Sequence, residues 1–277
     1  TPITLDIVHI DLYFFDDLNL VQLNVEVRAT DLPLATVRDI LFRFGRAYPS
    51  GWDVDGGGVH NTHATELLGV DGQVIARSDS ARREKFLQFV GQHRSPCISE
   101  HWACLLRPLV LDHSDEPGDL RYRLIEYHRM PVMAYVAVDR PRELSTEDWV
   151  RLGLAATLHP DEQVPVNDPT VVNFTSLYCQ DRFWTDSDAG PNTRFICTGN
   201  ALTVVGDSAS GFFADAERGV LAQFRHQYFL VFLLAHLHRA SLLVFSDVLV
   251  GAVNALNIRN DESVRAFKRR IRSNFET

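Results

Sequence analysis

The sequence has few cysteines and lacks the long apolar stretches of an integral membrane protein. Its 4 cysteines include no C-x-x-C pair, so neither a zinc knuckle nor a thioredoxin-like redox motif is indicated. We expect reduced thiols, as in a cytosolic protein. The chain contains no uninterrupted run of about 18 or more apolar residues, and we therefore expect no membrane-spanning helix in it.

The composition is that of an acidic globular protein. Hydrophobic residues make up 45% of the 277 residues, and 36 Asp and Glu against 27 Lys and Arg give a net charge of −9. The apolar fraction excludes a disordered chain, and the scattered glycines and prolines exclude a low-complexity one. The excess negative charge argues against a nucleic-acid partner, and we expect none.

The two ends of the sequence favour a piece of a longer protein. The chain begins at Thr1 rather than at a methionine and shows no signal-peptide pattern. It stops at Thr277, inside a pattern typical of a charged helix. We therefore expect further residues beyond Thr277.

Residues 1–210 alternate between strand and helix patterns, which predicts an α+β fold. Apolar alternation on either side of Asp16-Asp17-Leu18-Asn19 predicts a β-hairpin, and Asp71-Gly72 is typical of the turn of a second one. The expected strands are 3–14, 20–28, 65–70, 73–76, 122–127, 132–138, 194–197 and 201–205, and the expected helices are 34–48, 80–92, 98–106 and 145–156. This order predicts a mixed α/β/α layered domain with a largely antiparallel or mixed sheet.

The pattern changes after residue 210. From Asp215 to Leu256 there is no proline, and glycine occurs only at 219 and 251, which predicts one helix of about 40 residues and about 60 Å. A second helix, rich in Arg and Lys, is expected from Ser263 to Asn274. We therefore divide the chain into a mixed α/β domain, residues 1–210, and a long helical region, residues 211–277, truncated at its C-terminal end. Such a helix needs a partner helix or another subunit to cover its apolar side chains.

Gly206-Asp207-Ser208 is the sequence motif that most resembles a catalytic motif. A strand ending in Gly-Asp-Ser resembles the nucleophile block of the SGNH hydrolases, in which a histidine must activate the serine. That family places the block near its N-terminus and an Asp-x-x-His block near its C-terminus, whereas here the string is late and no such block follows. A turn before a helix is the preferred interpretation, and a soluble hydrolase using Ser208 is an alternative.

An acidic loop supplies the candidate metal ligands. Its carboxylates are Asp112, Asp115, Glu116 and Asp119. Several oxygens close together can hold a hard divalent cation, while a solvated surface loop is the simpler interpretation. The histidines of the long helix, His226, His236 and His238, are interpreted as polar boundaries of its apolar residues rather than as a ligand set.

Five stretches of the chain together resemble a bacterial subgroup of the CorA-type divalent-cation transporters. They are residues 42–49, 127–131, 217–228, 242–247 and 263–269. The resemblance implies the soluble cytoplasmic N-terminal region of a pentameric membrane transporter, at the cytoplasmic face of the inner membrane. The membrane helices and the Gly-Met-Asn signature of that family are absent from this chain and would follow Thr277. The resemblance also implies transport of magnesium or a related cation, with regulatory carboxylates between subunits.

The expected function is therefore cation sensing and gating rather than catalysis. Divalent cations are the expected ligands, self-association into a homo-oligomer the expected assembly, and membrane attachment is expected through segments missing from this chain. No cofactor is required beyond a regulatory Mg²⁺ or other divalent cation, which would stabilise one arrangement of subunits over another. The alternatives are the hydrolase and a soluble helix-mediated interaction module with no transport role.

Overall fold

The computed structural model has an α+β fold and divides into two compact units. One unit comprises residues 29–232, and the other comprises residues 1–28 together with 233–277. The structure describes residues 3–15, 18–27, 29–44, 51–52, 58–59, 65–78, 109–111, 120–122, 125, 131–158, 163–165, 167–185, 190–199, 201–254 and 261–275. The α+β class predicted from the sequence is confirmed.

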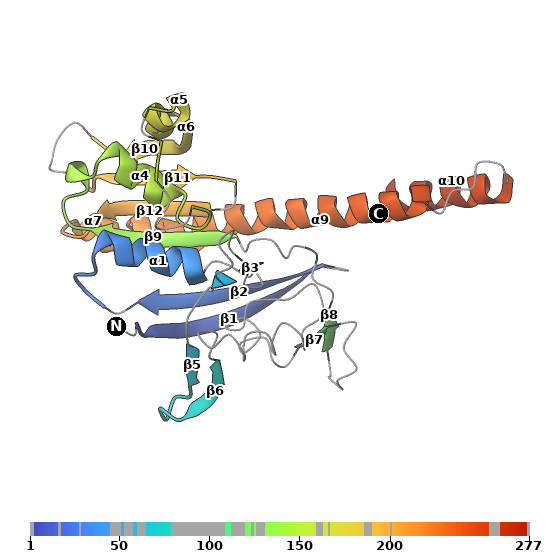
Figure 1. Ribbon diagram of the computed structural model, residues 1–277, viewed down its shortest axis with the longest axis horizontal. Coiled ribbons are helices and arrows are strands. Elements are labelled where there is room, and N and C mark those ends of the chain that lie inside the picture. Colours follow the sequence, from blue (N-terminus) through green and yellow to red (C-terminus); the bar gives the residue numbers. More distant parts are fainter. Residues whose placement is uncertain are drawn as a thin grey trace. The chain divides into compact units, whose positions relative to one another are not determined.

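A four-stranded mixed sheet forms the centre of unit 29–232 (Figure 1). Its order is β10 (Cys179–Phe183), β11 (Thr193–Cys197), β12 (Ala201–Asp207) and β9 (Val132–Val138). Strand β12 pairs with β9 in parallel and with β11 in antiparallel orientation, and β10 pairs with β11 in antiparallel orientation. The hairpin predicted from Arg194 to Val205 is confirmed, and the Thr198 N–H closes it by donating to the Ala201 carbonyl at 2.9 Å.

Helices pack against both faces of this sheet. Successive side chains of a strand point to opposite faces, so Val205 joins one apolar cluster and its neighbour Val204 joins another. The first cluster takes side chains from α1 (Leu34–Phe44), α4 (Thr146–Gly153), α5 (Pro169–Val172) and α6 (Phe174–Tyr178). The second takes side chains from α7 (Gly211–Ala214), α8 (Val220–Gln223) and the helical turn after α8. This is the predicted α/β/α layering.

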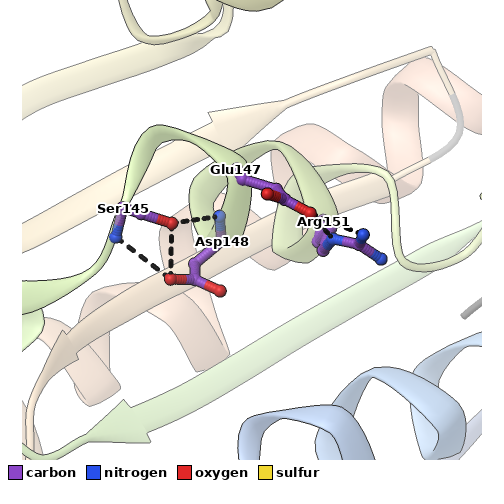
Figure 2. Close-up of polar contacts among 4 residues, drawn as sticks. All are labelled: Ser145, Glu147, Asp148 and Arg151. Atoms are coloured by element: carbon purple, nitrogen blue, oxygen red, sulfur yellow. Dashed lines mark hydrogen bonds and ion pairs between the residues drawn. The ribbon is translucent and has the colours of Figure 1, made fainter. Parts of the chain in front are cut away.

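Helix α4 follows a short 3-10 turn, η1 (Pro141–Glu143), and begins at a capping box (Figure 2). The Asp148 N–H donates to the Ser145 hydroxyl at 3.1 Å, and the Ser145 N–H donates to the Asp148 carboxylate at 3.0 Å. One turn further on, the Arg151 guanidinium donates to the Glu147 carboxylate at 2.8 Å. The two bonds between Ser145 and Asp148 satisfy N–H groups that a helix start leaves free, and they confirm the helix start predicted at Ser145.

Two-stranded pairs make up the other described strands. Strands β1 (Leu5–Phe15) and β2 (Leu18–Val27) form the first predicted hairpin, with a register shift between Ile7 and His9. Strands β5 (Thr65–Leu68) and β6 (Val74–Ser78) form the second, and Gly72 has φ 76° in its turn, a conformation that favours glycine. The short pairs are β3 (Gly51–Trp52) with β4 (Gly58–Val59) and β7 (Leu109–Leu111) with β8 (Leu120–Tyr122).

One continuous helix of 35 residues runs from Val220 to Asn254 (Figure 1). It consists of α8, a π-helical turn η2 (Phe224–Tyr228) and α9 (Phe229–Asn254). It starts later than predicted because the Asp215 carboxylate accepts the N–H groups of Glu217 and Arg218, at 2.8 and 3.1 Å, and so holds a turn before the helix. The second predicted helix is present as α10 (Asp261–Phe275).

The boundary that we predicted at residue 210 falls within unit 29–232. Phe213 and Val220 are buried in the second apolar cluster, and Phe224, Tyr228 and Phe232 pack against it. The start of the long helical region is therefore part of the layered unit. The change of unit comes between residues 232 and 233, inside α9.

Candidate functional site

Helix α9 carries large apolar side chains on its surface. Eight of them are more than a third exposed: Leu230, Val231, Leu234, Leu242, Leu243, Leu249, Val250 and Val253. We call these eight residues the apolar helix surface. Single exposed apolar residues are common on proteins, whereas larger apolar patches are frequent where a protein binds another surface.

The helix that carries this surface is long and apolar enough to cross a membrane, judged by length and composition. The absence of an uninterrupted apolar run predicts no such helix, and here the two criteria differ. His236, His238 and Arg239 interrupt the run, whereas the mean hydropathy over a window tolerates them. Length and composition alone also fit a helix that packs against protein.

Polar residues divide the apolar helix surface near its middle. Residues four apart share a face of a helix, so the exposed His238 lies in one row between Leu234 and Leu242. Arg239 beside it is also exposed, whereas His236 is only partly exposed. The histidines therefore interrupt the apolar residues, as interpreted from the sequence, and His236 and His238 differ in exposure.

The π-helical turn η2 joins α8 to α9. Its aromatic residues Phe224 and Tyr228 pack on the second apolar cluster, while His226 is exposed. Beneath it, the Tyr135 ring lies 4.3 Å from the Phe213 ring and 5.1 Å from the Phe224 ring, between centroids. The Tyr135 hydroxyl donates to the Phe213 carbonyl, and burial raises the pKa of this phenol. π-helical turns inside α-helices are frequent at functional sites.

A shallow groove lies beside this turn within unit 29–232. It has a volume of about 330 Å³ and is lined by Arg182, Glu217, Arg218, Gln223, His226 and Gln227, with the small side chain of Ala222. Arg182 comes from β10, Arg218 from the turn before α8, and His226 from η2. Sequence reasoning missed the groove, because only the folding of β10 against the helical segment brings Arg182 to the other residues.

The predicted cation site lies outside the described residues. Asp112, Asp115, Glu116 and Asp119 all belong to the stretch 112–119, which the structure does not describe. The same holds for the helices predicted at 80–92 and 98–106. Within the described ranges, no group of three or more His, Cys, Asp or Glu side chains is placed to hold a metal ion. The acidic loop therefore stays a prediction.

Ser208 lies exposed in the turn that follows β12. Its N–H donates to the Val138 carbonyl at 3.0 Å, and the Asp207 carboxylate accepts the Ala209 N–H at 2.9 Å. In the part of the chain that the structure describes, no hydrogen bond joins Ser208 to a histidine. Asp207 thus shapes a turn, and a nucleophilic role for Ser208 stays a prediction for an activity assay.

Comparisons with known proteins identify no relative of this chain. No protein family matches it, and neither a curated protein nor a solved structure is significantly similar.

Proposed function

We propose that this chain is the cytoplasmic sensing and gating region of a CorA-like transporter of magnesium or another divalent cation. One observation carries the proposal: a continuous helix of 35 residues begins in a layered α+β unit and bears the apolar helix surface. This combination agrees with the architecture that the sequence resemblance implies. The location would be the cytoplasmic face of the inner membrane, with attachment through segments beyond Thr277.

The apolar helix surface favours self-association. Burying a Leu or Val side chain contributes about 1.5–3 kcal/mol relative to leaving it exposed, and Leu242 and Val231 are 69% and 66% exposed. Copies of the helix packed around a common axis would bury these residues together. A homopentamer is the assembly that the resemblance implies.

Protein is a better partner for this surface than lipid. Arg239 and Asp247 are exposed on α9, and a charged residue at the centre of a membrane helix costs about 2.5–3.5 kcal/mol. Between subunits the same residues can form ion pairs or reach water. The polar interruption at His238 and Arg239 is then compatible with a helix bundle.

Gating would follow from charge. A net charge of −9 for each chain is multiplied in an oligomer and attracts divalent cations. A cation held by carboxylates at a contact between subunits would stabilise one arrangement of subunits over another. This mechanism requires no catalytic residue and no cofactor.

Sedimentation velocity and calorimetry test the proposal. We expect the chain to associate in MgCl₂ and to bind Mg²⁺ saturably at millimolar concentration. The double change Leu242→Glu and Val250→Glu should yield monomers with an unchanged circular dichroism spectrum. The double change Ser241→Glu and Ser246→Glu, which adds the same two negative charges at neighbouring exposed polar positions, should leave association intact. An associated wild type that takes up neither Mg²⁺ nor Co²⁺ would contradict the sensing role.

The coding sequence downstream of Thr277 gives an independent test. The proposal requires two apolar spans with a Gly-Met-Asn motif at the end of the first. A stop codon directly after Thr277 would refute it and would leave the helix-mediated interaction module as the better explanation of the apolar helix surface.

A further inference from the structure

The groove beside the π-helical turn gathers positive charge in an otherwise acidic chain. Arg182, Arg218 and His226 come from three separate segments and line one cavity of about 330 Å³. Two arginines against the single carboxylate of Glu217 give the lining a formal charge of 2 − 1 = +1, whereas the whole chain carries a net charge of −9. A concentration of cationic side chains in a concave site attracts an anion.

The two guanidinium groups in the groove are open to a ligand. Elsewhere on the same sheet, Arg194 pairs with the Asp181 carboxylate at 3.1 Å. Among the residues that the structure describes, neither Arg182 nor Arg218 makes an ion pair with a carboxylate. Arg182 instead lies over the Phe183 ring, 5.2 Å from its centroid, which leaves its N–H donors available.

The rest of the lining suits an oxyanion that carries further polar groups. Gln223 and Gln227 add amide donors, and Glu217 adds one carboxylate that can accept a hydroxyl of the same ligand. The planar fork of arginine matches the oxygens of a phosphate group, often through two parallel hydrogen bonds. The volume lies at the lower end of the range for small-molecule sites, about 300–1,000 Å³.

We propose that this groove binds a small phosphate-bearing anion, either inorganic phosphate or the phosphate group of a nucleotide. Arg182 and Arg218 would hold the phosphate oxygens, and His226 and the two glutamines would complete the contacts. Such a ligand would connect the end strand β10 to the π-helical turn at the start of the long helix. The proposal depends on the groove alone and does not require the chain to belong to a transporter.

Calorimetric titration of the chain with sodium phosphate and with ATP, both in EDTA, tests this proposal. We expect saturable binding with one site per chain. Arg182→Gln and Arg218→Gln should each weaken it about tenfold or more, since each removes a charge-assisted contact. Arg140→Gln is the matched control, because Arg140 is an exposed arginine of the same unit that does not line the groove. Circular dichroism should show all three variants folded.

The two ligands distinguish the source of the phosphate group. Equal affinity for phosphate and ATP would assign inorganic phosphate, and tighter binding of ATP would assign a nucleotide. The proposal is overturned if the wild type binds neither ligand saturably at millimolar concentration. It is equally overturned if both groove variants bind as tightly as the wild type and the Arg140→Gln control.

Discussion

The central sheet and the long helix are both rich in apolar residues, but they differ in where those residues lie. Val204 and Val205 of β12 are 0% exposed, on opposite faces of the sheet, whereas Leu242 of α9 is 69% exposed. The partners of β12 belong to the same unit. Apolar content alone therefore does not tell whether a segment completes its packing within the chain.

Truncation of Phe213 should give the largest loss of stability. Phe213 is 1% exposed and stacks on Tyr135, so Phe213→Ala should lower the free energy of unfolding by about 3–5 kcal/mol. Phe212→Ala is the matched control, because its neighbouring ring is 42% exposed and should cost about 1 kcal/mol. Urea denaturation measures both. Equal losses would show that Phe213 is not more deeply buried than Phe212.

Burial of Cys179 should give a smaller, pH-dependent effect. Desolvation raises the pKa of this thiol from 9.0 to about 11, so folding favours the protonated form. The stabilisation that the protonated thiol gives the folded state is fully present below pH 9 and is lost as the pH rises toward 11. The free energy of unfolding falls by about 1 kcal/mol over this range, after allowance for partial exposure. The difference in unfolding free energy between wild type and Cys179→Ala should therefore change over this window. A difference that is constant from pH 8 to about 11 would show that the thiol is solvated.

Truncation on the apolar helix surface should have the smallest effect on folding. Leu242→Ala should change the free energy of unfolding by less than about 0.5 kcal/mol, measured at a protein concentration where the chain is monomeric. The same truncation of a covered leucine, Leu152→Ala, should cost about 2–5 kcal/mol, since Leu152 is 0% exposed. A loss at Leu242 as large as at Leu152 would show that the chain itself covers this part of α9.

Local patterns predicted the elements well, because their causes are local. Apolar alternation specified both hairpins, Asp71-Gly72 specified a turn, and Ser145 with Asp148 specified a helix start. The start of the long helix was misplaced because the Asp215 side chain holds the preceding residues in a turn. These side-chain hydrogen bonds compete with helix formation, and the spacing of apolar residues does not reveal them.

Sequence patterns could not predict the groove or the division into units. Phe213 belongs to the layered unit because it packs on Tyr135, a contact between residues far apart in the sequence. Arg182 and His226 line the same groove for the same kind of reason. The apolar helix surface was anticipated as a requirement for a partner, but which side chains are exposed follows only from the packing around α9.

The π-helical turn has a consequence for the rotational phase of the helix that follows it. Each residue of an α-helix advances the chain by about 100° around the helix axis, and a π turn contains an extra residue relative to an α turn. Removing one residue from Phe224–Tyr228 would therefore convert the π turn into an α turn, and the residues on either side of it would keep nearly the same rotational phase. The turn thus absorbs one extra residue locally, without changing which faces of α8 and α9 carry their apolar side chains.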